Sequence, residues 1–139
     1  MSEAENLFGD EHVRVYRETG GETGHIWREG STILLLTTVG RKSGRESTTP
    51  LIYGLDGDNP VIVASKGGAP EHPGWYRNLV KNPAAHVQIL GEKFHVRARD
   101  AEGEERERLW KMMNGIWKHY DEYQEKTDRE IPVVVLERR

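Results

Sequence analysis

The feature that most constrains the fold is a series of short apolar runs separated by turn-forming residues. Residues 32–39 (TILLLTTV), 47–55 (STTPLIYGL) and 61–65 (VIVAS) are rich in β-branched and aliphatic side chains, and they are too short for typical helices. A Gly-rich turn and an Asp-Gly turn separate them, and both are typical of hairpins. The pattern predicts three strands in an antiparallel meander, with Pro50 restricting the second strand to an edge or a bulge.

The second half of the chain mixes helical and strand-like periodicity. The expected elements are helices over 75–82 and 101–126, the latter bent near Gly115, and strands over 84–90, 93–100 and 131–137. The resulting order is β-β-β-α-β-β-α-β, and hairpins dominate it. This order predicts a mainly β fold with flanking helices (α+β), in which an antiparallel barrel carries the helices on its outside.

Length and composition narrow the classes of function. The 139 residues suit a single domain, with residues 1–30 as an N-terminal arm or short helix and residues 31–139 as the barrel. The absence of cysteine excludes disulfides, thiolate metal sites and cysteine nucleophiles. The histidines lack ligand-like spacing, so no metal site is expected. A net charge of −3 argues against nucleic-acid binding, and the polar N-terminus and short apolar runs predict a cytoplasmic location.

Two glycine-rich segments carry cations that suit an anionic ligand. The turn at residues 40–45 (GRKSGR) places three cations among glycines, and such turns can bind anions through backbone N–H groups and guanidinium donors. Residues 64–68 (ASKGG) add a lysine and two glycines, which allow a ligand to approach the backbone closely. A solvated hairpin turn and a flexible loop are the plainer interpretations of these two segments.

Two further segments contribute aromatic rings. Residues 72–78 (HPGWYRN) open a helix, and a helix N-terminus favours anions and polar ring edges. Trp117, Tyr120 and Tyr123 recur every three residues and would share one helix face, either in the core or as an open wall over a flat ligand. No nucleophile–base pair accompanies these segments. This combination suits a site where a bound cofactor carries the chemistry.

Three stretches together resemble the deazaflavin-dependent nitroreductase family of actinobacteria. They are LLLTTVGRKSGRESTTPL, VIVASKGGAPEHPGWYRNLVKNP and the tail with YDEY and TDREIPVVVLE, and the similarity runs from about Tyr16 to Glu137. The resemblance implies a split β-barrel like that of FMN-binding proteins. It also implies an oxidoreductase that uses the reduced deazaflavin coenzyme F420 to transfer a hydride to a quinone, such as menaquinone, or to a nitroaromatic or nitroimidazole compound.

The resemblance further implies which residues contact the coenzyme. Its anionic tail would lie at the basic turn, the following strand would run along it, and two further segments would complete the pocket. The residues expected to bind the coenzyme are Arg41, Lys42, Ser43, Ser47, Thr48, Thr49, Pro50, Leu51, Ile52, Ala64, Ser65, Lys66, Gly74, Trp75, Tyr76, Arg77 and Asn78. Some relatives carry an arginine where this chain has Ser47, and Arg45 is the candidate to supply that charge.

The acceptor side is implied in the same way. Trp117, Tyr120 and Tyr123 match positions that wall the substrate side in the family. Ser65 and Tyr120 are the candidate catalytic hydroxyls, which would hydrogen-bond the acceptor or deliver a proton. Tyrosine has an unperturbed pKa of about 10 and therefore stays a donor at neutral pH.

Two alternatives use the same residues differently. An FMN-dependent reductase of the same fold would bind a single phosphate, which needs fewer cations than this chain offers. A non-catalytic deazaflavin carrier would keep the basic turn but would not need an open aromatic face. Split barrels of this type often pair through a sheet face, so a homodimer is compatible with the resemblance. The resemblance is also compatible with peripheral membrane contact to reach a quinone, but the polar N-terminus gives this little support.

Overall fold

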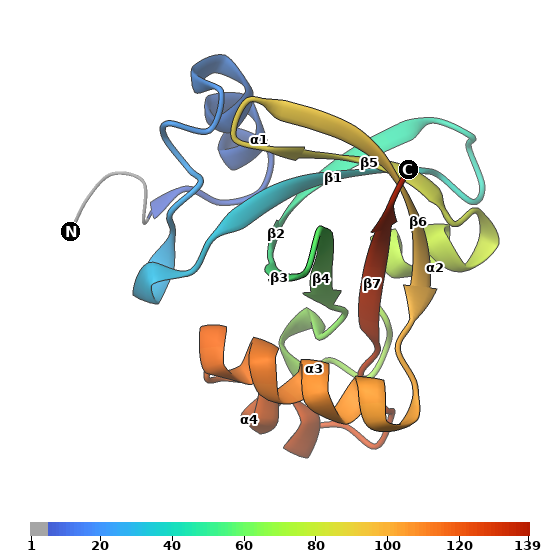
Figure 1. Cartoon of the computed structure of the whole chain (residues 1–139). Helices are drawn as coiled ribbons and strands as arrows, with labels where there is room; N and C mark the ends of the chain where they lie inside the picture. The colour runs from blue at the N-terminus through green and yellow to red at the C-terminus, as the bar shows by residue number, and fades with distance from the viewer. Residues whose placement is uncertain (1–5) are drawn as a thin grey trace.

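Seven short strands form one antiparallel sheet that carries helices at its edges and ends, as the computed structural model of residues 6–139 shows (Figure 1). The strands are β1 (Ile33–Val39), β2 (Glu46–Ile52), β3 (Gly54–Asp56), β4 (Asn59–Val63), β5 (Ala84–Ile89), β6 (Glu92–Asp100) and β7 (Val133–Arg138). The helices are α1 (Gly9–Thr19), α2 (Gly74–Lys81), α3 (Gly103–Ile116) and α4 (Tyr120–Glu125), with short 3-10 turns η2 (Arg28–Gly30) and η3 (Lys66–Gly68).

The strand order across the sheet is β2-β1-β5-β6-β7-β4-β3. The two edge strands, β2 and β3, follow each other in the chain, so the sheet curls into a half-barrel that brings its edges together (Figure 1). Pro50 lies in the edge strand β2, where its missing N–H leaves no ladder position empty. The expected α+β split-barrel fold is confirmed.

The predicted meander is only partly observed: the third predicted strand, β4, pairs with the end of the second, which forms β3, but not with its main part, β2. The predicted strand over 47–55 is interrupted at Tyr53, whose side chain is buried, and continues as the separate strand β3. Strand β4 then pairs with β3 and with the C-terminal strand β7, in the register Val61↔Val135. Two valine-rich strands that are buried on both faces therefore pair with each other, although more than half of the chain separates them in sequence.

The predicted helix over 101–126, bent near Gly115, is observed as two helices, α3 and α4, with a corner at residues 117–119, just beyond the predicted bend. Hydrogen bonds to Asp121 hold this corner: its carboxylate accepts from the Trp110 indole (2.6 Å) and from the Asn114 amide (3.0 Å). The Asn114 side-chain oxygen in turn accepts from the Asp121 backbone N–H at 3.0 Å. Trp117 therefore follows the last residue of α3, while Tyr120 and Tyr123 belong to α4.

Within the described part of the N-terminal segment, the short-helix alternative is the one observed, as α1. Val13 and Tyr16 are buried against β1, and the Tyr16 hydroxyl donates to the Ile33 carbonyl at 3.0 Å and accepts from the Leu90 N–H at 2.7 Å. Burial raises the pKa of Tyr16 to about 12. The first five residues of the predicted arm lie outside the described residues.

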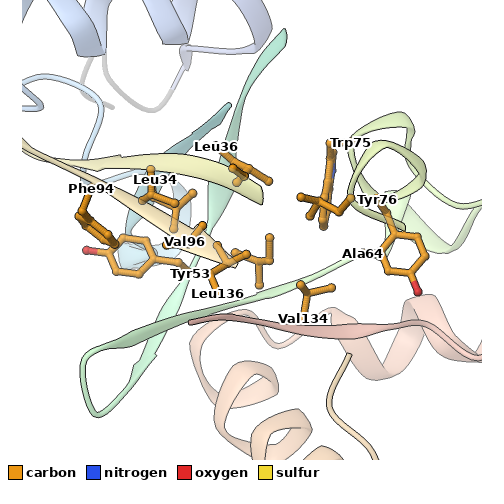
Figure 2. Packing of buried hydrophobic residues seen from close by; sticks show 14 residues of the cluster. Leu34, Leu36, Tyr53, Ala64, Trp75, Tyr76, Phe94, Val96, Val134 and Leu136 are labelled. Atoms are coloured by element: carbon orange, nitrogen blue, oxygen red, sulfur yellow. The ribbon is translucent and has the colours of Figure 1, made fainter. Parts of the chain in front are cut away.

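The core fills the half-barrel and extends beneath α2. Figure 2 shows side chains from several strands converging on one interior, with Trp75 and Tyr76 of α2 beside Ala64 and Val134. A second cluster joins β4 and β7 to Leu109 and Met113 of α3. None of the described helices is long and apolar enough to cross a membrane.

Candidate functional site

A cavity of about 450 Å³ opens where β2, the loop after β4, the start of α2 and the α3–α4 corner meet α1. Its volume lies within the range of pockets that hold small ligands and cofactors. The predicted site residues on its wall are Thr49, Pro50, Leu51, Ile52, Ser65, Lys66, Trp75, Trp117, Tyr120 and Tyr123. The fold thus brings segments that the sequence analysis identified separately together around one cavity.

The basic turn lies outside the cavity wall and is joined to α2. The Asn78 side-chain oxygen accepts from the Arg41 backbone N–H (3.2 Å) and from its guanidinium (2.9 Å), and the Asn78 amide donates to the Thr38 hydroxyl at 3.0 Å. The Arg41 guanidinium also donates to the Gly74 carbonyl at 3.3 Å. Arg41, Gly74 and Asn78 therefore fix the turn against the helix start.

The remaining turn residues are exposed. The Ser43 hydroxyl accepts from the Arg45 backbone N–H at 3.1 Å, and Gly44 adopts a left-handed φ of 73°, which favours glycine. The side chains of Lys42 and Arg45 form no hydrogen bond or ion pair with any described residue. Their charges are free to meet an anion, and the neighbouring Ser47 is exposed as well.

Some predicted residues are not brought to the cavity. The Thr48 hydroxyl accepts from the Arg17 guanidinium at 2.9 Å and thereby binds α1 to β2. Tyr76 is buried, its hydroxyl donates to the Asp100 carboxylate at 2.6 Å, and burial raises its pKa. Ala64 is fully buried and Arg77 is exposed outside the cavity.

The aromatic side of the cavity is built from the α3–α4 corner and the N-terminal segment. The Trp117 indole donates to the Tyr123 hydroxyl at 3.3 Å, and the Trp117 ring stacks on Trp27 with centroids 6.0 Å apart and planes 19° apart. Tyr120 meets Tyr123 edge-on at 6.2 Å. Tyr120 is only 4% exposed, and this burial raises its pKa, so the phenol stays protonated.

The sequence prediction missed the contribution of the N-terminal segment and several neighbours of the predicted residues. The missed residues on the wall are Phe8, Gly9, His12, Trp27, Ile33, Val63, Gly67 and Pro73. His12 is fixed by its Nε2, which donates to the Gly24 carbonyl at 2.8 Å. The apolar spacing of Val13 and Tyr16 was the available sign that this segment is an amphipathic helix with a buried face.

Comparisons with known proteins identify the family of this chain. The model of the F420H(2)-dependent quinone reductase family matches residues 9–138. An F420H(2)-dependent quinone reductase of Mycobacterium tuberculosis (strain H37Rv) is 43% identical over 131 residues, which cover 92% of this chain and 88% of that protein.

Solved structures show the same relationship. An F420-H2-dependent reductase, FDR-A, is 45% identical with a TM-score of 0.71, covering 76% of this chain and 93% of its own. A structure described as a domain-swapped dimer is 40% identical with a TM-score of 0.74, covering 90% of this chain and 92% of its own. The expected resemblance is confirmed. The chain belongs to the F420H(2)-dependent quinone reductase family, and it is therefore an oxidoreductase whose cofactor is coenzyme F420.

Proposed function

We propose that this chain reduces a quinone with reduced F420 and that both ligands meet in the cavity described above. The observation that carries the proposal is the convergence of β2, the 64–68 loop, the start of α2 and the α3–α4 corner on one wall. When bound, reduced F420 supplies a hydride, and the quinone needs one further proton to become a quinol. The protein residues have to hold the two ligands, exclude water and supply hydrogen bonds or that proton.

The residues on the coenzyme side suit F420. Thr49–Ile52 present the half-buried edge of β2 to the cavity, and Lys66 adds a cation on the wall. Beyond the wall, the exposed side chains of Lys42 and Arg45, which pair with no described residue, suit a long anionic tail, because charge and bidentate donors both favour anions. We propose that Arg45 supplies the charge that some relatives place at Ser47. FMN, with one phosphate, would use fewer of these cations.

On the acceptor side, we assign Trp117 and Tyr123 to the walls and the hydroxyls of Ser65 and Tyr120 to the polar contacts. A flat quinone suits the aromatic wall, since offset rings attract one another. Because burial keeps the Tyr120 phenol protonated, Tyr120 can donate to an acceptor oxygen as negative charge develops there. No described residue forms a hydrogen bond with the hydroxyl of Ser65 or of Tyr120, so both are available to a ligand.

The test begins with binding. The purified protein is titrated with oxidised F420 and, separately, with FMN, while the fluorescence of each is followed. It is then mixed with reduced F420 and menadione, and the absorbance of oxidised F420 is followed as it recovers. Tight FMN binding without F420 binding would refute the proposal. Binding of F420 without turnover on any acceptor would favour the carrier alternative.

Several finer statements are part of the proposal. Nitroaromatic and nitroimidazole compounds are proposed as further acceptors, because the aromatic wall suits flat electron-poor rings, and the same absorbance assay tests them. A homodimer is proposed from the 40% identical relative described as a domain-swapped dimer, and light scattering tests it. A single-domain organisation, a cytoplasmic location, the absence of nucleic-acid binding and weak peripheral membrane contact stay predictions, and vesicle co-sedimentation tests the last.

A further inference from the structure

Arg129 makes an unusual set of hydrogen bonds behind the cavity wall. Its Nε donates to the Ala69 carbonyl at 2.9 Å, and its Nη2 donates to the Ser65 carbonyl at 2.7 Å. Its Nη1 donates to the Ala64 carbonyl at 3.2 Å and to His72 Nδ1 at 3.0 Å. Every nitrogen of one guanidinium therefore fastens the loop that follows β4.

This loop has a conformation that requires such support. Lys66, Gly67 and Gly68 adopt φ values of 47°, 64° and 85°, three left-handed residues in succession, of which the lysine is the costly one. Conformations of this kind persist only where the surroundings determine them, and they concentrate at functional sites. The residues that the loop places on the cavity wall are Ser65, Lys66 and Gly67.

The other end of Arg129 is fixed to the acceptor side. The Gln124 side chain, on α4, donates to the Arg129 carbonyl at 2.8 Å and accepts from the Ile131 N–H at 2.9 Å. The loop also touches α4 directly: a Cβ at Gly68 would lie 2.7 Å from the Tyr123 carbonyl oxygen. The loop with Ser65 and the helix with Tyr123 are thus held as one unit.

We propose that Arg129 is a positioning residue for the reaction: its planar fork sets the distance between Ser65 and Lys66 on one side of the cavity and the aromatic wall of α4 on the other. A lysine keeps the charge but offers a single nitrogen. That nitrogen cannot reach both the Ser65 carbonyl at the start of the loop and the Ala69 carbonyl further along it. No ion pair joins Arg129 to a described carboxylate, so the hydrogen-bond geometry is what distinguishes arginine here. The inference rests on the proposed placement of F420 and quinone in this cavity.

The test compares Arg129→Lys with the matched control Arg106→Lys. Arg106 donates to the Ile131 carbonyl at 2.6 Å and pairs with Glu130 at 3.3 Å, so it supports the same stretch of chain but does not contact the loop. The readouts are the melting temperature, the Kd for oxidised F420, and kcat and KM with menadione. We expect the melting temperature of both variants to be lower than that of the wild type. Only Arg129→Lys should lower kcat, by about 10- to 100-fold, because small misplacements near reacting groups have effects of that size.

A second pair of variants approaches the same unit from the loop. Gly68→Ala would push the loop away from Tyr123, whereas Gly57→Ala has a similar positive φ of 63° with nothing within 4 Å. We expect Gly68→Ala to repeat the loss of kcat, and Gly57→Ala to keep it. Wild-type kcat in Arg129→Lys, or an equal loss in Arg106→Lys, would overturn this inference alone. Absence of F420 binding to the wild type would overturn the proposed function and this inference with it.

Discussion

Replacing Asn78 with alanine is expected to detach the basic turn from α2. The Asn78 side chain is only 7% exposed and takes part in three hydrogen bonds, two with Arg41 and one with Thr38. Neutral hydrogen bonds contribute about 1 kcal/mol each and a bond to a charged group about 2 kcal/mol. Allowing for water reaching the partly exposed Arg41, we expect the free energy of unfolding to fall by about 3 kcal/mol.

The variant also tests whether the turn binds the coenzyme. Urea unfolding should show the lower stability, with a melting temperature lower by about 10 °C for a chain of this size, and fluorescence titration should show a higher Kd for F420. Asn78→Asp serves as the control, since its carboxylate still accepts from Arg41 and from the Thr38 hydroxyl. Wild-type stability in Asn78→Ala would refute the inference that the Asn78 hydrogen bonds hold the basic turn against α2. Lost stability with unchanged F420 affinity would remove the turn from the coenzyme site.

Three further predictions follow from exposed and buried groups. Lys42→Ala should raise the Kd for F420 and flatten its salt dependence, whereas Lys93→Ala, on the exposed side of β6, should do neither in titrations at several salt concentrations. Tyr120→Phe should lower kcat with menadione by at least about tenfold at unchanged F420 affinity; an unchanged kcat would exclude Tyr120 from the chemistry. Because burial raises the Tyr16 pKa to about 12 from 10.0, the unfolded chain releases this proton first, and stability should fall by about 2 kcal/mol as pH rises between these values. Tyr16→Phe should lack that part of the decline in denaturation measured against pH.

The fold was predictable from the sequence to the level of its elements. Alternating apolar residues and turn dipeptides act locally, so they identified the strands and the hairpin of β5 and β6 correctly. Strand partners depend on long-range contacts, and the local pattern therefore did not show that β7 pairs with β4 on the side away from β3. The bend expected near Gly115 is a full break between α3 and α4, because the hydrogen bonds of Asp121 with Trp110 and Asn114 compete with a helix that local propensity alone would continue.

The sequence predicted the site residues that lie in segments with a distinctive composition or spacing. The β2 strand, the ASKGG loop and the aromatic residues near 120 lie on the cavity wall as expected. His12 and Trp27 come from a segment whose polar composition indicated an arm or short helix, and only the packing of α1 on β1 brings them to the wall. Arg129 lies in a polar stretch with no distinctive spacing, and its role depends on carbonyl groups some 60 residues earlier in the chain.

The three cations of the basic turn have different roles: one stabilises the turn, and two are available to a ligand. The sequence alone gives the same expected role to Arg41, Lys42 and Arg45. In the structure, however, the Arg41 guanidinium donates hydrogen bonds to Asn78 and Gly74 of α2. Removing Arg41 would therefore lower stability and displace the turn, so a loss of coenzyme affinity in that variant would not identify a direct contact. The side chains of Lys42 and Arg45 form no hydrogen bond or ion pair with a described residue, so we expect their removal to change the charge without changing the fold. The salt dependence of F420 binding in these two variants is consequently the direct measure of whether the turn holds the anionic tail.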